Sequence, residues 1–243
     1  DSWVRAPRMP STAADPAAGI AVGSASSSPT WRETIATDTF DYVFTPDRPA
    51  HFRAGQYLEL TLAHAHPDAR GNRRYLTVAS SPTEPDIRFG IKFYSAPSSF
   101  KKALAALSPG CAMMAGQLSG DFTLPKDKEQ KLVFIAGGIG VTPFRSMVQY
   151  LLDTKEQRTV TLFYSNKTKD EIAYKEVFDR AEKELGMKTV YTLSDVDKAP
   201  SDWTGHTGFL NKEIIIAETP DYLDRAFYLS GPHGMVAAFE KIL

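Results

Sequence analysis

The segment that most constrains how this chain can fold is a glycine-rich loop, GGIGVTP at residues 137–143, between a strand-like and a helix-like run. The run before it, KLVFIA, is short and continuously apolar, which is typical of a buried parallel strand. The run after it has helical spacing, with Thr142 as the expected cap and Pro143 at the first helical position. Glycines permit a tight turn and a helix start adds free N–H groups, so the loop suits a pyrophosphate. Because proline takes the last place of the usual GxGxxG pattern, a glycine-rich turn without a ligand stays an alternative.

The rest of the C-terminal half continues this alternation of strand and helix. After the charged segment KDKEQK, buried strand-like runs (TVTLFYS, KTVYTLS, RAFYLSG) alternate with helical patterns (DEIAYKEVFDRAEKEL, residues 211–217, MVAAFEKIL). Such repetition predicts a parallel sheet with helices on both faces. We therefore expect an α/β domain over residues 127–243.

The N-terminal half has a different pattern. From residue 31 to residue 126, short β-rich runs such as GQYLELTLAH and DIRFGIKFYS alternate apolar and polar residues, as half-buried antiparallel strands do. SSFKKALAAL predicts one short helix opened by Ser98 or Ser99, and PGCAMMAGQLSGDFTLP predicts one or two further strands. These elements predict a small antiparallel β-barrel. Residues 1–30 are rich in Ala, Ser and Pro and predict a flexible linker, to which a further part of the protein is expected to be attached.

Composition narrows the function classes. A net charge of −1 gives no general attraction to nucleic acid, and no run of 18 apolar residues is present to span a membrane. The single cysteine, Cys111, excludes an internal disulfide framework and a cysteine-ligated iron–sulfur cluster. The segment His64 to Asp68 lies in a polar loop, and we assign no metal site to it. A cytoplasmic location is expected.

Four motifs in order carry a resemblance to a known family. RYLT (74–77), SSF (98–100), GGIGVTP and LSGPHGM (229–235) together resemble the ferredoxin–NADP reductase superfamily over residues 31–243. The resemblance implies an FAD-binding domain over 31–126 and an NAD(P)-binding domain over 127–243. It also implies an enzyme, a reductase that passes a hydride from NADPH or NADH to FAD and electrons on to a redox partner.

The resemblance assigns flavin-binding roles to the first two motifs. Arg74 is expected to meet the pyrophosphate, Leu76 to stand where an aromatic ring usually covers the isoalloxazine, and Thr77 to bond to flavin N5. An ordinary strand with an exposed arginine and a simply capped helix are the alternatives. Ser98, Ser99 and Phe100 correspond to the family's second flavin-phosphate segment. The further residues implied at this cofactor are Tyr75, Val78, Ala79, Ser80, Lys92 and Phe93.

The dinucleotide is expected at the last two motifs. Gly138, Gly140, Thr142 and Pro143 are implied to cradle its pyrophosphate, and Ser165 and Asn166 to meet the adenosine ribose. A carboxylate at that place would favour NADH. Instead Lys167 and Lys169 are nearby, either to meet the 2′-phosphate of NADPH or as solvated loop charges. Ser230, Gly231 and Pro232 stand where the family has Cys-Gly-Pro beside the nicotinamide, so Ser230 and Thr77 are the catalytic candidates.

Three functional alternatives remain at this point. The chain is a complete reductase with a diffusible acceptor such as a ferredoxin, flavodoxin, quinone or free flavin. Alternatively, it is the cytosolic reductase part of a larger protein, tethered through its linker to a membrane or redox domain, which the absent initiator Met favours. The third is a non-enzymatic flavin or dinucleotide sensor, suggested by Leu76 and Ser230. Members of the family usually continue past the last helix with a final strand and a tail that often covers the flavin. Because the given sequence ends at Leu243, we expect either that this tail lies outside it or that the nicotinamide side of the flavin is open.

Overall fold

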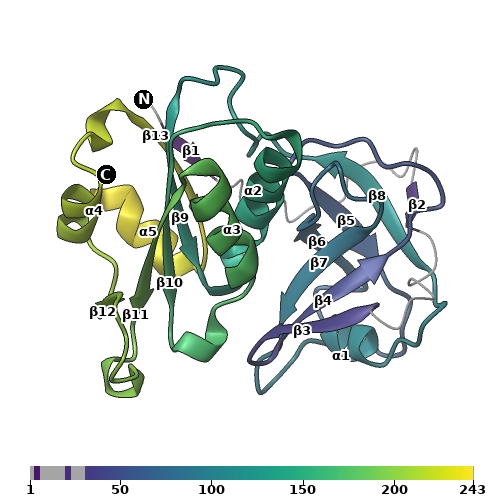
Figure 1. Cartoon of the computed structure of the whole chain (residues 1–243). Coiled ribbons are helices and arrows are strands. Elements are labelled where there is room, and N and C mark those ends of the chain that lie inside the picture. The colour runs from purple at the N-terminus through teal and green to yellow at the C-terminus, as the bar shows by residue number, and fades with distance from the viewer. Residues whose placement is uncertain (1–2, 6–19, 23–30, 243) are drawn as a thin grey trace.

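The structure is a computed structural model that describes residues 3–5, 20–22 and 31–242 (Figure 1). Two lobes lie side by side. We call them the β lobe (residues 31–126, with 20–22) and the α/β lobe (residues 127–242, with 3–5). The predicted fold class, an antiparallel β domain followed by a parallel α/β domain, is confirmed. The boundary near residue 126 stays a prediction.

The β lobe consists of two antiparallel sheets, ordered β2-β8-β5-β6 and β3-β4-β7. Buried and partly exposed residues alternate along β5 and β7, as the sequence predicts. The buried side chains of both sheets form one core with helix α1. The elements are β2 (Ile20–Val22), β3 (Arg32–Ala36), β4 (Thr39–Phe44), β5 (Tyr57–Thr61), β6 (Arg73–Thr77), β7 (Ile87–Lys92), α1 (Ser99–Ala105) and β8 (Met113–Ser119).

The expected barrel is not closed by a continuous ladder of hydrogen bonds. After β6 the chain turns a corner, where Val78 N–H donates to the Gln56 carbonyl at 2.9 Å and Ala79 N–H donates to the Arg88 carbonyl at 2.8 Å. The chain thus passes from one sheet to the other, and the ladder is interrupted there. The strands of the β lobe therefore form two sheets packed face to face, which is a common arrangement of short antiparallel strands that do not close into a barrel.

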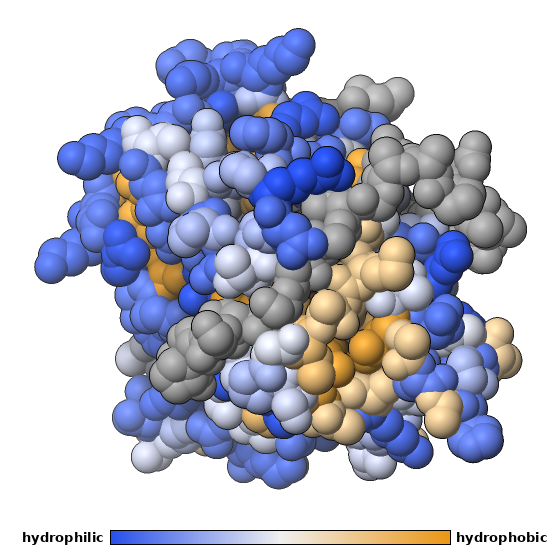
Figure 2. All heavy atoms as spheres, turned by 90° about the vertical axis from the view of Figure 1, so that its right-hand side faces the viewer, coloured by the Kyte–Doolittle hydropathy of each residue, from blue (hydrophilic) through white to orange (hydrophobic). Residues whose placement is uncertain are grey.

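One face of the β lobe is partly apolar. Figure 2 shows the side turned away from the α/β lobe, where apolar side chains gather on part of the surface and polar ones surround them. Strand β8 carries Met114, which is 65% exposed.

Residues 1–30 depart from the expected linker at two short segments. Strand β1 (Trp3–Arg5) pairs in parallel with β13, and β2 pairs antiparallel with β8. Both segments add to the edge of an existing sheet, where unpaired N–H and C=O groups can accept another strand. The rest of the predicted linker lies outside the described residues.

The α/β lobe has one parallel sheet in the order β1-β13-β9-β10-β11-β12. Helices α2 and α3 pack on one face, and α4 and α5 on the other. The elements are β9 (Lys131–Gly137), α2 (Thr142–Thr154), β10 (Val160–Asn166), α3 (Lys175–Leu185), β11 (Lys188–Leu193), β12 (His206–Thr207), α4 (Lys212–Glu218), β13 (Arg225–Ser230) and α5 (His233–Ile242), with short 3₁₀ turns η1 (Gly138–Val141), η2 (Lys169–Glu171), η3 (Val196–Lys198) and η4 (Tyr222–Asp224).

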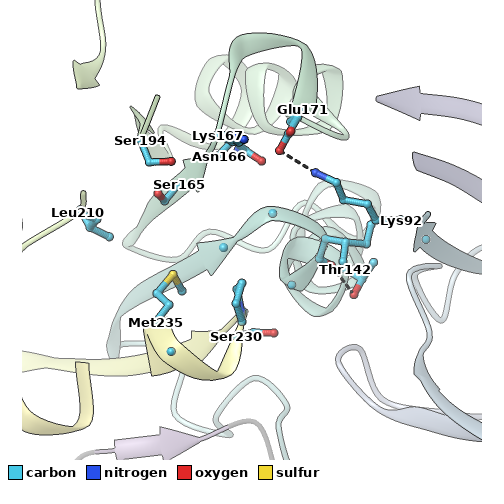
Figure 3. A pocket seen from close by; sticks show the side chains of 18 of the residues that line it. Lys92, Thr142, Ser165, Asn166, Lys167, Glu171, Ser194, Leu210, Ser230 and Met235 are labelled. Atoms are coloured by element: carbon cyan, nitrogen blue, oxygen red, sulfur yellow. Dashed lines mark hydrogen bonds and ion pairs between the residues drawn. The ribbon is translucent and has the colours of Figure 1, made fainter. Parts of the chain in front are cut away.

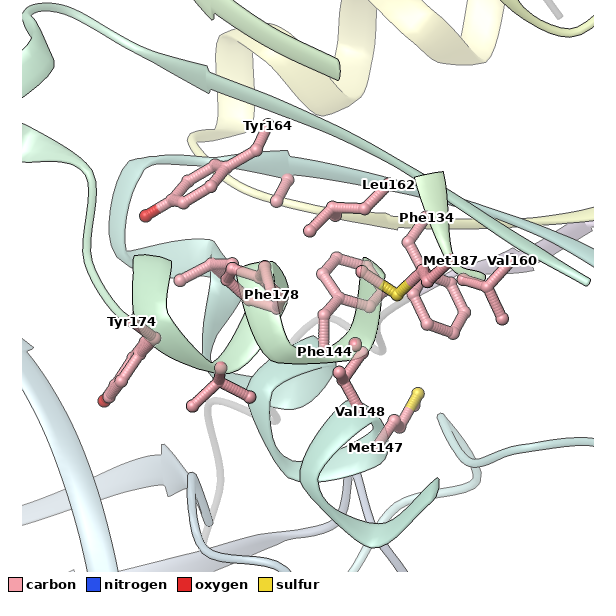
Figure 4. Close-up of a cluster of buried hydrophobic side chains, with 14 of the residues drawn as sticks. Phe134, Phe144, Met147, Val148, Val160, Leu162, Tyr164, Tyr174, Phe178 and Met187 are labelled. Atoms are coloured by element: carbon pink, nitrogen blue, oxygen red, sulfur yellow. The ribbon is translucent and has the colours of Figure 1, made fainter. Parts of the chain in front are cut away.

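The core under α2 and α3 explains why KLVFIA and TPFRSMVQYLLDT form these elements (Figure 4). Phe134 of β9 and Phe144 of α2 stack with ring centroids 4.6 Å apart, and both are fully buried. Phe178 of α3 lies in the same cluster. Thr142 is not the cap of α2, because the 3₁₀ turn η1 precedes it and makes Val141 the N-cap residue. The Thr142 hydroxyl donates instead to the Ile139 carbonyl at 3.2 Å.

The strand order creates a switch point between β9 and β13. From β9 the chain proceeds outward through β10, β11 and β12, and then returns to place β13 on the other side of β9. In open α/β sheets, ligands bind in the crevice at such a point, outside the carboxyl ends of the strands. GGIGVTP and LSGPHGM follow β9 and β13, so both motifs meet at this crevice.

Buried polar contacts hold the lobes together. Arg145 of α2 donates to the Ala79 carbonyl at 3.0 Å and forms an ion pair with Glu84. The neighbouring Ser146 hydroxyl donates to the Ser80 carbonyl at 2.5 Å. Three residues at the corner of the β lobe, Ala79, Ser80 and Glu84, are thereby bonded to one helix of the α/β lobe.

A second buried contact joins the lobes at Asp41. The Tyr174 hydroxyl donates to Asp41 Oδ1 at 2.5 Å, and Arg88 Nη1 lies 3.6 Å from the other carboxylate oxygen. Burial raises the pKa of Asp41 and that of Tyr174. Gly90 of β7 fits tightly beneath, since a Cβ there would lie 2.4 Å from Tyr174 Oη. The two lobes therefore meet at a close-packed interface.

Candidate active site

A cavity of about 770 Å³ lies between the lobes, at the carboxyl ends of β9, β10 and β13 (Figure 3). The β lobe contributes the end of β6 and part of β7 as the facing wall. Pockets at such a switch point are common ligand sites. Most of the residues predicted from the sequence line it: Tyr75, Leu76, Thr77, Lys92, Gly138, Gly140, Thr142, Ser165, Asn166, Ser230, Gly231 and Pro232.

The glycine loop brings the ends of β9 and β13 close together. A Cβ on Gly140 would lie 2.6 Å from Gly231 Cα and 2.6 Å from the Ser230 carbonyl oxygen, so only glycine permits this approach. Gly138 differs: its φ is +51°, and no atom lies within 4 Å of its Cβ position. Backbone N–H groups at such an open glycine, before a helix, are accessible to an anion. The loop therefore serves both close packing and an exposed backbone.

Asn166, the last residue of β10, lies in the wall of the cavity with an unused amide. It is 3% exposed, and within the described part of the chain neither its amide nitrogen nor its amide oxygen has a hydrogen-bond partner of normal geometry, although the Tyr164 hydroxyl is close. Burial raises the pKa of Tyr164, which stays protonated. A buried amide normally has a partner, and both amide atoms of Asn166 are covered, so its side chain must turn toward the cavity before it can bond a polar ligand. Ser165, Lys167 and Ser194 lie beside it (Figure 3).

The β-lobe wall contains the second half of the predicted motif RYLT. Leu76 and Thr77 are partly exposed to the cavity, and Tyr94 stands 61% exposed at its edge. Tyr75 packs edge-on against Tyr57, with centroids 5.7 Å apart. The wall is thus an apolar and aromatic surface that also carries the hydroxyls of Thr77, Tyr75 and Tyr94, which suits a flat ring with polar edges.

An ion pair crosses the cavity from lobe to lobe. Lys92 Nζ of β7 lies 2.6 Å from Glu171 Oε2 of η2 (Figure 3). Lys101 Nζ donates to the Lys92 carbonyl at 2.5 Å, and burial, followed by the charge of Arg70, lowers the pKa of Lys101. The pair connects the predicted flavin side to the predicted dinucleotide side.

Other predicted residues do not line the cavity. Val78, Ala79 and Ser80 are fully buried at the corner after β6, and the Ser80 hydroxyl is used by the Asp86 carbonyl and the Arg88 N–H. The remaining ones are Arg74, Phe93, Ser98, Ser99, Phe100 and Pro143, which pack in the core, cap α1 or bond to a neighbouring loop. Ser98, not Ser99, is the N-cap of α1.

Arg74 is the main departure from the expected site. Its side chain is 8% exposed and forms an ion pair with Asp68 at 2.9 Å. The predicted contact between Arg74 and a flavin pyrophosphate would require the guanidinium to be released from Asp68. The sequence does not reveal the pairing, because six residues and a turn separate the two groups.

The structure adds cavity residues that the sequence motifs do not include. Gly90, Tyr94, Glu171, Phe209 and Leu210 come from four separate elements or loops, and no local pattern marks them. Phe209 is 82% exposed at the rim. The unusual exposure of two aromatic residues becomes visible only once the fold brings them to one cavity.

The residues present fit a nicotinamide dinucleotide and the ring of a flavin. The open Gly138 backbone and the unused Asn166 amide lie on the α/β side, opposite Leu76 and Thr77. A flavin phosphate fits less well, since Arg74 is engaged with Asp68. Among the described residues there is no cluster of three metal-ligating side chains, and none of the described helices is long and apolar enough to cross a membrane.

Comparison with known proteins supports the arrangement. Residues 134–241 match the family model described as an oxidoreductase NAD-binding domain. The chain is 28% identical over 196 residues to the phenol hydroxylase P5 protein of Acinetobacter pittii, covering 78% of this chain and 53% of that protein. It spans about half the length of the curated relatives it matches.

Solved structures share the fold over nearly the whole chain. A cytochrome P450 reductase of Amycolatopsis superposes with a TM-score of 0.76 at 23% identity, over 92% of this chain and 64% of that one. A ferredoxin NADP⁺ reductase from Neisseria gonorrhoeae, solved with bound FAD and NADP, has a TM-score of 0.67 at 15% identity, over 90% of this chain and 86% of that one. The matched relatives and solved structures are ferredoxin–NADP reductase-like reductase modules, so the resemblance of this chain to that superfamily is confirmed. The oxidoreductase class expected from the motifs is confirmed at the level of this superfamily.

Proposed function

We propose that this chain is a flavin-dependent reductase that takes a hydride from NADPH or NADH onto bound FAD and passes electrons to a separate redox partner. The observation that carries the proposal is the shared cavity between the lobes. Leu76 and Thr77 of the β lobe face the same space as Gly138 and Ser230 of the α/β lobe. A site that holds two rings in contact is what hydride transfer between two cofactors requires.

The α/β lobe would hold the dinucleotide. The Gly138 backbone and the start of α2 would meet its pyrophosphate, with Gly140 keeping the strand ends close. Ser165 and the unused Asn166 amide would bond the adenosine ribose. Lys167 lines the same part of the cavity, where its charge favours the 2′-phosphate of NADPH. The sequence-based preference for NADPH rests on Lys167, on Lys169 and on the missing carboxylate at the end of β10.

The β lobe would hold the flavin ring. When bound, a flavin accepts a hydride and releases electrons singly or in pairs. Leu76 would cover one ring face, and the Thr77 hydroxyl would set the orientation of the ring edge. Ser230 would lie beside the nicotinamide, where its hydroxyl can position the carboxamide of that ring. Both hydroxyls act by positioning, so each contributes modestly to the rate.

The acceptor is proposed from the relatives. One relative is named as a protein of a phenol hydroxylase and one structural neighbour as a cytochrome P450 reductase, which supports a protein acceptor distinct from this chain. Because the chain spans about half of such relatives, tethering to a further redox domain remains part of the proposal. The expected cytoplasmic location stays a prediction.

The proposal is tested with purified chain loaded with FAD and mixed anaerobically with NADPH or NADH. We expect the visible absorbance of oxidised flavin to disappear rapidly, faster with NADPH. Removing one hydroxyl in Thr77→Ala or Ser230→Ala should slow reduction roughly 2- to 12-fold, the equivalent of one neutral hydrogen bond.

The matched control is Ser201→Ala, which removes an exposed hydroxyl outside the cavity. Its reduction rate should equal that of the unaltered chain. If FAD binds and neither dinucleotide reduces it, hydride transfer is absent and the sensor alternative replaces the reductase.

A further inference from the structure

The two groups that the motifs assign to the flavin phosphates are both bonded to one carboxylate of this chain. Arg74 Nη2 donates to Asp68 Oδ1 at 2.9 Å and to Oδ2 at 3.0 Å. The Ser99 N–H donates to Asp68 Oδ2 at 3.2 Å. Asp68 therefore lies between an arginine and an amide that would otherwise be available to an external anion.

The rest of the Arg74 guanidinium is also engaged. Nη1 donates to the carbonyls of Arg70, Gly71 and Arg73 at 3.1, 3.0 and 2.7 Å. The guanidinium carbon lies 5.4 Å from the centroid of the Phe100 ring, and the side chain is 8% exposed. Bidentate recognition of a phosphate needs two parallel N–H groups on one edge of the fork. Arg74 offers no such free edge while Asp68 is in place.

The Ser99 hydroxyl is committed to the same loop. His64 Nδ1 lies 2.7 Å from the Leu62 carbonyl and therefore donates to it, which leaves Nε2 as an acceptor. The Ser99 hydroxyl, 3.0 Å away, donates to Nε2 and accepts the Asp68 N–H at 2.9 Å. The second predicted phosphate contact is thus used by residues 62–68.

We propose that Asp68 is an internal competitor of the flavin phosphates: its carboxylate occupies the anion position at Arg74, and a phosphate binds there only when Asp68 is displaced. This inference rests on the proposed flavin site. It follows that the chain recognises a flavin mainly through the ring, at Leu76 and Thr77, and gains little from the phosphate groups.

Charge supports the competition. Although desolvation opposes it, hydrogen bonds from the Arg70 N–H, from Arg74 and from Ser99 lower the pKa of Asp68 to about 2. The carboxylate is therefore ionised at neutral pH. A phosphate approaching Arg74 meets a negative charge already bonded to the guanidinium, and like charges at one site repel each other. Removing the Asp68 charge should favour phosphates and leave an uncharged ligand unaffected.

The first experiment compares three ligands with the unaltered chain. Riboflavin, FMN and FAD share the isoalloxazine ring, and only the last two carry phosphate. A free arginine normally makes a ligand that carries a phosphate bind at least about tenfold tighter than the same ligand without it. Because Arg74 is paired with Asp68, we expect the dissociation constants of FMN and riboflavin to differ by less than about threefold. Flavin fluorescence titration gives the dissociation constants. FMN binding about a hundredfold tighter than riboflavin would overturn the proposal, because Arg74 would then already serve the phosphate.

The second experiment removes the charge. In Asp68→Asn, FMN and FAD should bind about tenfold tighter, with riboflavin affinity unchanged. Asp68→Ala should also tighten the binding of FMN and FAD. The folding of each variant is checked by thermal unfolding, and Asp68→Ala is used in place of Asp68→Asn if Asp68→Asn does not fold. Equal tightening for riboflavin, or no change for FMN and FAD, would overturn the competition.

The matched control is Glu59→Gln. Glu59 pairs with the adjacent Arg73 at 3.5 Å, so this variant removes the same charge beside the neighbouring arginine. All three affinities should then stay within about twofold of the unaltered chain. Failure of the unaltered chain to bind any of the three ligands would refute the proposed flavin site itself, which is a result distinct from failure of the competition.

Discussion

Replacing Gly140 with alanine is expected to force the ends of β9 and β13 apart. The added Cβ would lie 2.6 Å from Gly231 Cα, 2.6 Å from the Ser230 carbonyl oxygen and 2.7 Å from Gly231 N. Carbon atoms pack at about 3.5–4.0 Å, so the overlap with Gly231 Cα is about 1 Å. All three atoms belong to the backbone, which cannot rotate away as a side chain can. Such overpacking costs about 1–3 kcal/mol of unfolding free energy.

Two measurements follow from this displacement. For a chain of this size each kcal/mol lowers Tm by about 2–4 °C, so Gly140→Ala should melt about 2–12 °C lower. Misplacing a positioning element by about 1 Å can reduce a reaction about a hundredfold, so the rate of flavin reduction by dinucleotide should fall at least tenfold. The rate is measured by anaerobic rapid mixing with FAD-loaded protein.

Gly186→Ala is the matched control. Gly186 is the C-cap of α3 with a φ of +66°, and no atom lies within 4 Å of its Cβ position. Alanine there suffers left-handed strain of about 1–2 kcal/mol without a clash. It should lower Tm while leaving the reduction rate unchanged. If Gly140→Ala keeps both its Tm and its rate, or if Gly186→Ala loses the rate equally, the close approach of the two strand ends is not what the site requires.

Two further variants test the interface and the charge network. Tyr174→Phe removes the donor 2.5 Å from the buried Asp41 carboxylate and should lower the free energy of unfolding by about 1–3 kcal/mol, measured by urea denaturation; an unchanged value would contradict the buried contact. In Asp221, hydrogen bonds from Lys131 and Arg225 lower the pKa from its ordinary 3.8 to about 2, so its stabilisation is present above pH 3.8 and is lost as pH falls toward 2. Asp221→Asn should therefore lower Tm at neutral pH, with a difference from the unaltered chain that shrinks between those two pH values; a constant difference would refute the linkage.

Local sequence patterns predicted the elements whose causes are local. The period-two alternation of GQYLELTLAH gave the half-buried strand β5, and the apolar KLVFIA gave the buried central strand β9. The glycine loop was predicted correctly as a turn between a strand and a helix. Since the parallel sheet brings the carboxyl ends of its strands to one edge, most of the residues assigned to the dinucleotide were also predicted to lie together, and they line one cavity.

Contacts that depend on distant residues were not predictable. The motif RYLT suggests a free Arg74, but the loop preceding β6 folds back and places Asp68 against it. Lys92 meets Glu171, which lies 79 residues further along the chain. Thr142 has the sequence of a cap, yet the 3₁₀ turn before it moves the helix start and redirects its hydroxyl to Ile139. In each case tertiary contacts override a correct local preference.

Access to the cavity depends on its rim more than on separation of the lobes. Parting the lobes would leave the guanidinium of Arg145, 9% exposed, without Glu84 and without the Ala79 carbonyl. Breaking a buried charge pair costs about 3–5 kcal/mol, which is a large part of the stability of a typical domain. Lys92 and Glu171 lie at the cavity with 16% and 19% of their side chains exposed, so water can replace their contact at a smaller cost. Opening the Lys92–Glu171 contact therefore costs less than separating the lobes at Arg145, so we expect a ligand that enters between the lobes to displace this ion pair and leave the Arg145 contacts in place.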